Sequence, residues 1–173
     1  MKKFFKIFSV LFIIIITGCL LLAFEINSSA YDPGIEGNRI HFKTPDFMVQ
    51  IINGKPDKVT EYSVSGAKEY VYHEQTLFGR QGSIHYHSLF GVNEVNIEIP
   101  VEAGYEETVF NEIGEYMCNV YSKKRGYYDE GIRVNEATGG LFHRLGADFG
   151  ATGISVMIEY EEKQIRVYTH YQY

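Results

Sequence analysis

The sequence predicts an α+β fold: two α-β units in which helices pack on one face of a mainly antiparallel sheet, behind an N-terminal membrane-anchoring helix or lipoprotein signal. Three observations support this prediction. An uncharged apolar run covers 7–24, apolar and polar residues alternate from 59 onward, and two stretches, 45–53 and 102–125, show helical spacing of apolar residues. The predicted organisation is a signal or anchor segment at 1–24, a tether at 25–39 and an extracytoplasmic α+β domain at 40–173.

The N-terminal apolar run has the length of a membrane span. Its 18 residues follow Lys2, Lys3 and Lys6. As a helix they would extend about 27 Å, close to the hydrocarbon core of about 30 Å. Because basic residues stay on the cytoplasmic side, we expect a cell-membrane protein that contacts the bilayer through 7–24 and exposes its C-terminal domain on the extracytoplasmic side.

A second interpretation of this run is a cleaved signal. Ile16-Thr17-Gly18-Cys19 resembles the lipobox of bacterial lipoproteins, which implies that Cys19 carries a lipid and becomes the new N-terminus. The apolar residues 20–24 that follow the cysteine instead favour an uncleaved helix. Lipidated and membrane-spanning forms both stay open, and both place the domain in the same compartment.

The polar residues 25–39 show no apolar period and are predicted to form the tether. Thr44 as N-cap, Pro45 at the first helical position and Gly54 at the end delimit a short amphipathic helix over 45–53. Three strands follow, at 59–64, 69–77 and 83–99 with a break near Gly91. The connections between them contain glycine, so we expect sequential antiparallel pairing.

The second predicted unit begins after Pro100. Residues 102–125 carry apolar side chains on one helical face and glutamates outside it. A short strand at 131–135 and a hairpin of 154–160 with 164–171 return the chain to the sheet. The intervening residues 137–153 contain five glycines, which predicts a loop and a place where function is concentrated.

Residues 44–99 resemble two groups of small domains. The pattern is a short helix ending in Gly54-Lys55-Pro56-Asp57, a strand, then Tyr70-Val71-Tyr72, a glycine turn and an apolar strand. It is similar to the SmpA/OmlA-like lipoproteins of outer-membrane assembly and to the related β-lactamase inhibitor proteins. The resemblance implies a non-catalytic domain that binds another protein near a membrane. The helix and hairpin after Pro100 depart from that pattern.

Composition excludes nucleic acid as a partner and favours protein binding. The chain has 16 basic against 22 acidic residues, and three of the basic ones precede the apolar run. A nucleic-acid surface needs clustered Lys and Arg. The 14 tyrosines suit sheet packing and contact surfaces. We therefore predict a membrane-tethered binding domain that contacts another envelope protein, with a structural spacer as an alternative.

The remaining alternative is a metal-dependent or hydrolytic envelope enzyme that uses histidines. His85 and His87 lie on one face of a predicted strand, and His73 on the preceding strand makes a possible zinc set. His143 and Asp148 form a histidine–carboxylate pair in the glycine-rich stretch. Cys118, in the amphipathic helix, is interpreted as a small buried side chain. The sequence predicts no catalytic residue and no cofactor, and these three strand histidines are its only metal candidates.

Overall fold

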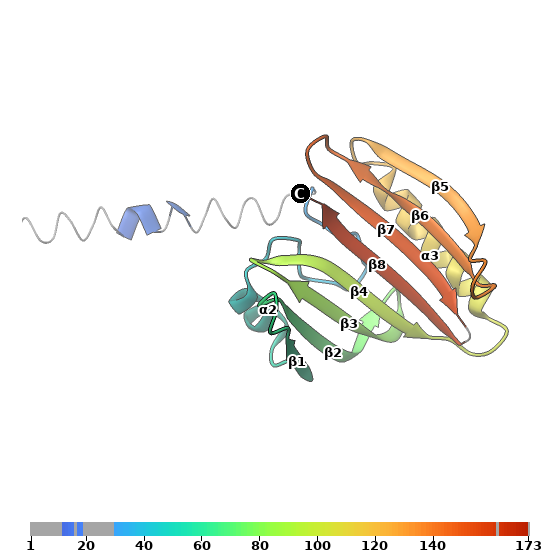
Figure 1. Ribbon diagram of the computed structural model, residues 1–173, viewed down its shortest axis with the longest axis horizontal. Helices are drawn as coiled ribbons and strands as arrows, with labels where there is room; N and C mark the ends of the chain where they lie inside the picture. Colours follow the sequence, from blue (N-terminus) through green and yellow to red (C-terminus); the bar gives the residue numbers. More distant parts are fainter. Residues whose placement is uncertain (1–11, 16, 19–29, 162, 173) are drawn as a thin grey trace, which may run out of the picture.

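The computed structural model describes residues 12–15, 17–18, 30–161 and 163–172. In this part of the chain, eight strands form a single sheet in which every pairing is antiparallel (Figure 1). The strands are β1 (Lys58–Glu61), β2 (Lys68–Leu77), β3 (Arg80–Ser88), β4 (Val92–Pro100), β5 (Tyr127–Val134), β6 (Leu141–Asp148), β7 (Gly153–Glu161) and β8 (Gln164–Gln172). The helices of the folded domain are α2 (Asp46–Asn53) and α3 (Glu106–Tyr121).

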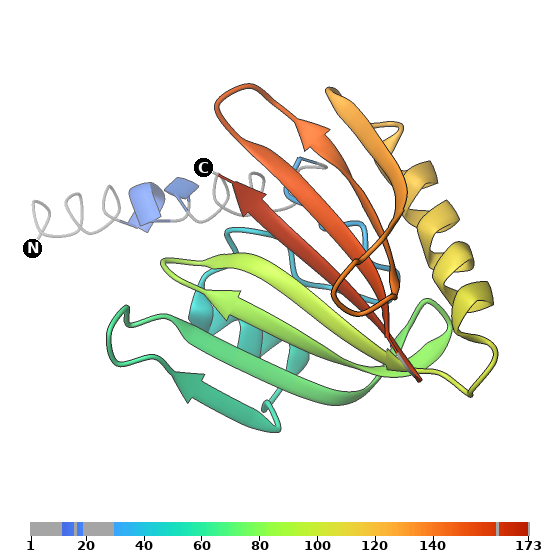
Figure 2. The same ribbon diagram turned by 45° about the vertical axis from the view of Figure 1, so that its right-hand side comes forward.

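Two four-stranded meanders make up the sheet, in the order β1-β2-β3-β4-β8-β7-β6-β5. They join where the last strand, β8, pairs with β4, with Ile97 opposite Val167 and Val95 opposite Thr169. This pairing connects residues about 70 positions apart, and Thr169 reinforces it by donating a 2.6 Å hydrogen bond to the Val95 carbonyl. The chain crosses between the two meanders through α3 (Figure 2).

The core lies on one face of the sheet, against α3 over one meander and against residues 35–49 toward the other. Alternate side chains of the central strands point to this face, as the two-residue period of a strand requires. They include Val95, Ile97 and Ile99 of β4, Ile165 and Val167 of β8, Val156 and Ile158 of β7, and Leu145 and Ala147 of β6. Val109, Phe110, Ile113, Met117 and Tyr121 of α3 are buried against them. The helix contacts β6, β7 and β8.

The predicted fold class is wrong in its arrangement. Instead of two α-β units with helices forming a layer, the described domain is mostly one antiparallel sheet. The helix α2 has eight residues and buries only Val49, so it is too short to cover its half of the sheet. It begins at Asp46, with Pro45 rather than Thr44 as its N-cap residue. α3 is also shorter than the predicted 102–125.

The glycine-rich stretch 137–153 is not a long loop, because it contains β6. Gly139 and Gly150, with φ of 72° and 98°, lie in the turns on either side of this strand, whereas Gly140, Gly146 and Gly153 permit close packing. At Gly146 a Cβ atom would lie 2.2 Å from the Ile154 carbonyl oxygen and 2.6 Å from the Tyr128 hydroxyl. Only a residue without a side chain fits such a site, so glycine here strengthens the sheet rather than interrupting it.

Residues 31–39, which the sequence assigned to the tether, pack on the domain. The Tyr31 carbonyl accepts a 2.8 Å hydrogen bond from the Phe42 N–H, and Ile35 is buried in the core. The buried Tyr121 hydroxyl donates a 2.9 Å hydrogen bond to the Pro33 carbonyl. Hydrogen bonds and the buried side chain of Ile35 hold this segment, so no apolar period reveals it in the sequence.

Among the residues that the structure describes, no helix combines the length and the apolar character needed to cross a membrane. Only residues 12–15, 17 and 18 of the predicted anchor 7–24 are described, and they are helical. Cys19, the predicted lipidation site, lies outside the described residues.

Candidate metal centre

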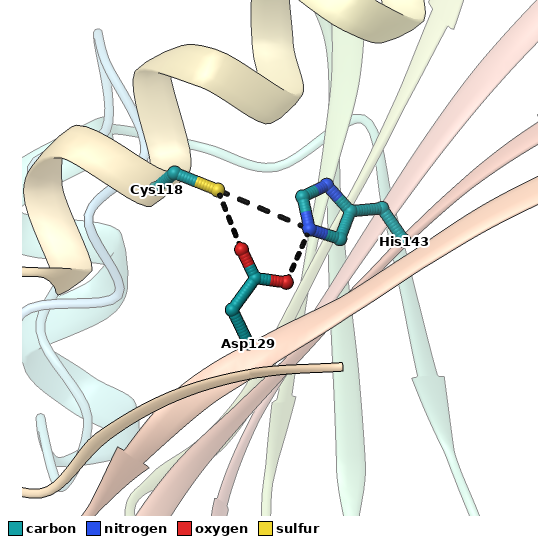
Figure 3. A group of neighbouring side chains, drawn as sticks. All are labelled: Cys118, Asp129 and His143. Atoms are coloured by element: carbon teal, nitrogen blue, oxygen red, sulfur yellow. Dashed lines mark hydrogen bonds and ion pairs between the residues drawn. The ribbon is translucent and has the colours of Figure 1, made fainter. Parts of the chain in front are cut away.

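Three side chains with metal-ligating atoms converge beside the outer half of the sheet: Cys118 from α3, Asp129 from β5 and His143 from β6 (Figure 3). The His143 Nε2 atom lies 2.7 Å from Asp129 Oδ1 and 3.9 Å from Cys118 Sγ. The thiol of Cys118 donates to Asp129 Oδ2 at 3.5 Å. The three donor atoms lie within 4.8 Å of one another, and no other such group of His, Cys, Asp or Glu occurs in the described residues.

The absence of a side chain at Gly114 leaves space on α3 for the imidazole ring of His143. Gly114 and Cys118 are four residues apart, so they lie on the same face of the helix. A Cβ atom at Gly114 would lie 3.3 Å from His143 Nδ1, which means that the ring packs directly over the glycine backbone. On β6, His143 shares its face with the buried Leu145 and points toward the helix. Glycine at 114 therefore sets the distance between α3 and the ring.

A bulge in β5 positions the carboxylate. Asp129 pairs with Leu145 and Ile132 with His143, so β5 contains an extra residue in this interval. Gly131, with φ of 76°, adopts the left-handed conformation that the bulge needs. Its N–H donates a 2.8 Å hydrogen bond to Asp129 Oδ1. The Tyr127 hydroxyl donates to the other carboxylate oxygen at 3.2 Å.

The protonation preferences of the acid and the thiol differ. Burial raises the pKa of Asp129, but hydrogen bonds from His143 and the Gly131 N–H outweigh it and bring the pKa below its ordinary value. Burial raises the pKa of the Cys118 thiol, and Asp129 raises it further, against the hydrogen bond from Tyr127. At neutral pH the group therefore contains a carboxylate and a protonated thiol.

The geometry argues against a nucleophilic relay. In such a relay the acid contacts one ring nitrogen and the nucleophile the other, so that the ring passes a proton between them. Here Asp129 and Cys118 both approach Nε2, while Nδ1 faces Gly114. Three donors directed at a common point are instead the arrangement that a shared cation satisfies.

The distances are close to those of a tetrahedral zinc site. With Zn–S of about 2.3 Å and Zn–N and Zn–O of about 2.0 Å, sulfur would lie about 3.5 Å from N and O, and N about 3.3 Å from O. The 3.5 Å between Cys118 Sγ and Asp129 Oδ2 agrees, although His143 contacts the other carboxylate oxygen, Oδ1. The Cys118–His143 pair at 3.9 Å would close slightly and the Asp129–His143 pair at 2.7 Å would open. Each of these two changes is about half an ångström, and the Asp129 carboxylate would also turn so that the metal binds one or both of its oxygens.

The three strand histidines proposed as metal candidates, His73, His85 and His87, do not belong to this centre. His85 Nδ1 and His87 Nε2 lie 2.9 and 3.7 Å from Glu69 Oε1, on the face of the sheet opposite the core. His73 Nδ1 contacts the Ser83 hydroxyl at 2.9 Å. Cross-strand pairing places His87 between Glu69 and Glu94, so an imidazole lies between two carboxylates across three neighbouring strands.

Sequence reasoning named two members of the centre in other roles and missed the third. His143 was paired with Asp148, but the Asp148 carboxylate accepts a hydrogen bond from the Gly150 N–H. Cys118 was interpreted as a buried apolar side chain, whereas its sulfur is half-buried beside polar groups. Asp129 was not considered. The available signals were the four-residue Gly114–Cys118 spacing and Asp129 two residues before Gly131, which is typical of a bulge or turn.

No family model, no curated protein and no solved structure matches this chain. The similarity to SmpA/OmlA-like and β-lactamase inhibitor domains stays a prediction. Function is therefore inferred from the chemistry of the side chains described above.

Proposed function

We propose that this chain is a membrane-tethered, extracytoplasmic domain that binds a divalent metal ion of the zinc class through Cys118, Asp129 and His143. The single observation that carries the proposal is the approach of a sulfur and a carboxylate oxygen to the same imidazole nitrogen, at 3.9 and 2.7 Å. One cation placed between the three side chains would contact all of them.

The donor set selects the class of metal. A thiolate and an imidazole favour zinc and neighbouring transition metals over magnesium or calcium, which prefer oxygen ligands. The thiolate and the carboxylate together supply two negative charges, which a divalent ion neutralises. The side chain of Asp129 is 33% exposed, so a fourth coordination position can face solvent. Three protein ligands with one open position are typical of zinc sites that bind a water molecule or a ligand.

The location in the proposal is supported by the N-terminal sequence. The uncharged run 7–24, which follows three lysines, is long enough to span a bilayer or to direct export of the domain. The described domain has one cysteine, Cys118, and it is free, so a metal would hold this thiol in a form that resists oxidation.

Cobalt titration of the full chain in detergent tests the metal proposal. Tetrahedral thiolate–Co²⁺ complexes give a near-ultraviolet charge-transfer band and intense visible bands, so the spectrum reports the sulfur ligand directly. We expect one Co²⁺ per chain, displaced by Zn²⁺. Because the Cys118 thiol is protonated without metal, binding should release a proton, measurable by calorimetry in buffers of different ionisation enthalpy.

Two cysteine variants make a matched pair for this titration. Cys118→Ser should lose the charge-transfer band, whereas Cys19→Ser should retain it, because Cys19 is the other cysteine of the chain. His143→Gln should lower the affinity and His73→Gln should not, since His73 contacts Ser83 instead. A wild-type chain that shows no thiolate band, or a Cys118→Ser chain that binds cobalt as well as wild type, would refute the proposal.

A second candidate function is binding of another envelope protein, and the edge strand β5 favours it. In the described sheet β5 pairs with β6 alone. Its Ile132 and Val134 side chains are exposed and alternate with polar neighbours. An open edge of this kind accepts an added strand from a partner. Crosslinking in cells through a C-terminal tag, with wild type compared to Val134→Lys, should capture a partner that the variant loses. Equal recovery from both chains would argue against β5 as the contact.

A further inference from the structure

One end of the sheet carries exposed apolar side chains close to the point where the chain joins the domain. Phe90, in the β3–β4 turn, is 99% exposed. Phe47 and Ile51 lie four residues apart on α2 and are 67% and 72% exposed. Val49, which faces the core, lies between them in sequence, so both point away from the sheet. We refer to Phe47, Ile51 and Phe90 as the apolar end.

Direct contacts join α2 and the β3–β4 turn. The Ser88 hydroxyl donates a hydrogen bond to the Asp46 carboxylate. Ser88 is the last residue before the turn, and Asp46 is the residue before Phe47. The Lys43 N–H donates to the Val92 carbonyl at 2.6 Å, and the Val92 N–H donates to the Thr44 carbonyl at 2.9 Å. Figure 1 shows α2 beside this turn, at the end of the sheet where β8 finishes. The apolar end is therefore one structural unit.

The chain enters the domain at the same place. Lys43 Nζ donates a 3.0 Å hydrogen bond to the Tyr31 hydroxyl and lies 4.4 Å from the centre of the Tyr31 ring. Tyr31 is seven residues after Phe24, where the uncharged run ends. Seven residues extend at most about 24 Å. If residues 7–24 lie in a bilayer, the apolar end is held close to its surface.

We propose that the apolar end inserts Phe90, Phe47 and Ile51 into the interfacial region of the bilayer from which the chain emerges. This inference rests on the membrane tether of the proposed function. Interfacial attachment needs exposed aromatic or aliphatic side chains that reach the boundary of the headgroups and acyl chains, with basic groups at headgroup level. Phe90 at the tip of a turn and the outer face of α2 supply the apolar side chains. The backbone of Lys43 lies against Gly91 of the same turn, and its ammonium group supplies a cation on the Tyr31 ring, where the chain enters the domain. Insertion would orient the sheet with its opposite end away from the membrane.

The chain contains no tryptophan, so a single introduced one is a specific probe. The experiment uses full-length Phe90→Trp and Phe47→Trp chains reconstituted in phosphatidylcholine vesicles, with and without lipid brominated near the headgroup. The matched control is Tyr105→Trp, an aromatic position that is 60% exposed. Tyr105 follows β4 at its other end, and a nine-residue strand separates the two positions by about 27 Å. A circular dichroism spectrum that matches wild type checks that each variant is folded.

We expect the emission of Phe90→Trp and Phe47→Trp to be blue-shifted and quenched by brominated lipid, while Tyr105→Trp stays unquenched. Chains that float with the vesicles but show no greater quenching at 90 and 47 than at 105 would overturn this inference and leave the tether intact. Chains that do not float would overturn the tether and the inference together. A blue shift without quenching indicates contact with another protein or a second copy, and also overturns it. Metal binding is measured independently in every case.

Discussion

Replacing Gly114 by alanine should separate the stability of the fold from the affinity of the metal centre. Glycine in a helix interior costs about 1 kcal/mol relative to alanine, so the substitution favours α3. The new Cβ atom would lie 3.3 Å from His143 Nδ1, which is tighter than ordinary contact. His143 is buried and must move by a few tenths of an ångström.

The direction of that movement determines the effect on metal binding. Gly114 and Cys118 lie on the same helical face, so a ring pushed away from Gly114 also moves away from the Cys118 sulfur. The Sγ–Nε2 distance is already 3.9 Å, longer than the distance of about 3.5 Å that a shared zinc ion needs. Changes next to metal ligands typically lower affinity about 10- to 100-fold. We expect a loss of about tenfold, with the metal-free domain unchanged or stabilised by up to about 1 kcal/mol.

The assay combines cobalt affinity with chemical unfolding of the metal-free chain. Asn111→Ala is the matched control, because Asn111 lies on the exposed side of α3 and its replacement also improves helix propensity. It should stabilise the metal-free domain slightly and leave cobalt affinity unchanged. If Gly114→Ala and Asn111→Ala bind cobalt equally well, the contact between Gly114 and the imidazole does not set the geometry of the centre.

Three other perturbations test the fold. Burial raises the pKa of Glu69, but hydrogen bonding and charge from the neighbouring histidines bring it below the ordinary 4.5. The contribution of this carboxylate to stability is therefore present above pH 4.5 and is lost as the pH falls through the lowered pKa. In acid unfolding, Glu69→Gln should lose less stability than wild type over that pH interval. Tyr121→Phe removes the hydroxyl that donates to the Pro33 carbonyl and should cost about 1 kcal/mol in urea unfolding and speed proteolysis of residues 31–39. At Gly126, where φ is 71°, an alanine Cβ would lie 1.8 Å from the Asp148 carbonyl oxygen, so Gly126→Ala should lower the thermal midpoint by several degrees, corresponding to more than about 2 kcal/mol; an unchanged midpoint would contradict the backbone contact.

The local alternation of apolar and polar residues predicted the positions of most of the strands. β2, β3, β4 and the β7–β8 hairpin lie close to the predicted ranges, because period-two alternation reflects which face of a strand is buried. β6 was missed because Gly146 is needed for close approach of Ile154 and Tyr128, and this cannot be distinguished from a turn glycine in the sequence. The arrangement was also missed, since pairing of β4 with β8 depends on residues distant in the chain.

The same division applies to the candidate metal centre. The helix of Cys118 and the chemical nature of His143 were evident from sequence, but residues 118, 129 and 143 come together only when α3 packs over β5 and β6. Their spacing is not that of a local metal motif, in which ligands share one helix or one turn. Asp129 in particular depends on the β5 bulge, which exists only once β5 pairs with β6.

The sequence by itself determined the alternating strands, the amphipathic helix α3 and the apolar N-terminal run, because these depend on the solvent preferences of residues that are near one another in the chain. The tertiary structure decided the single sheet, the packing of residues 31–39 and the meeting of Cys118, Asp129 and His143. Those features depend on contacts between distant segments, which become favourable only after the chain has folded around a shared core.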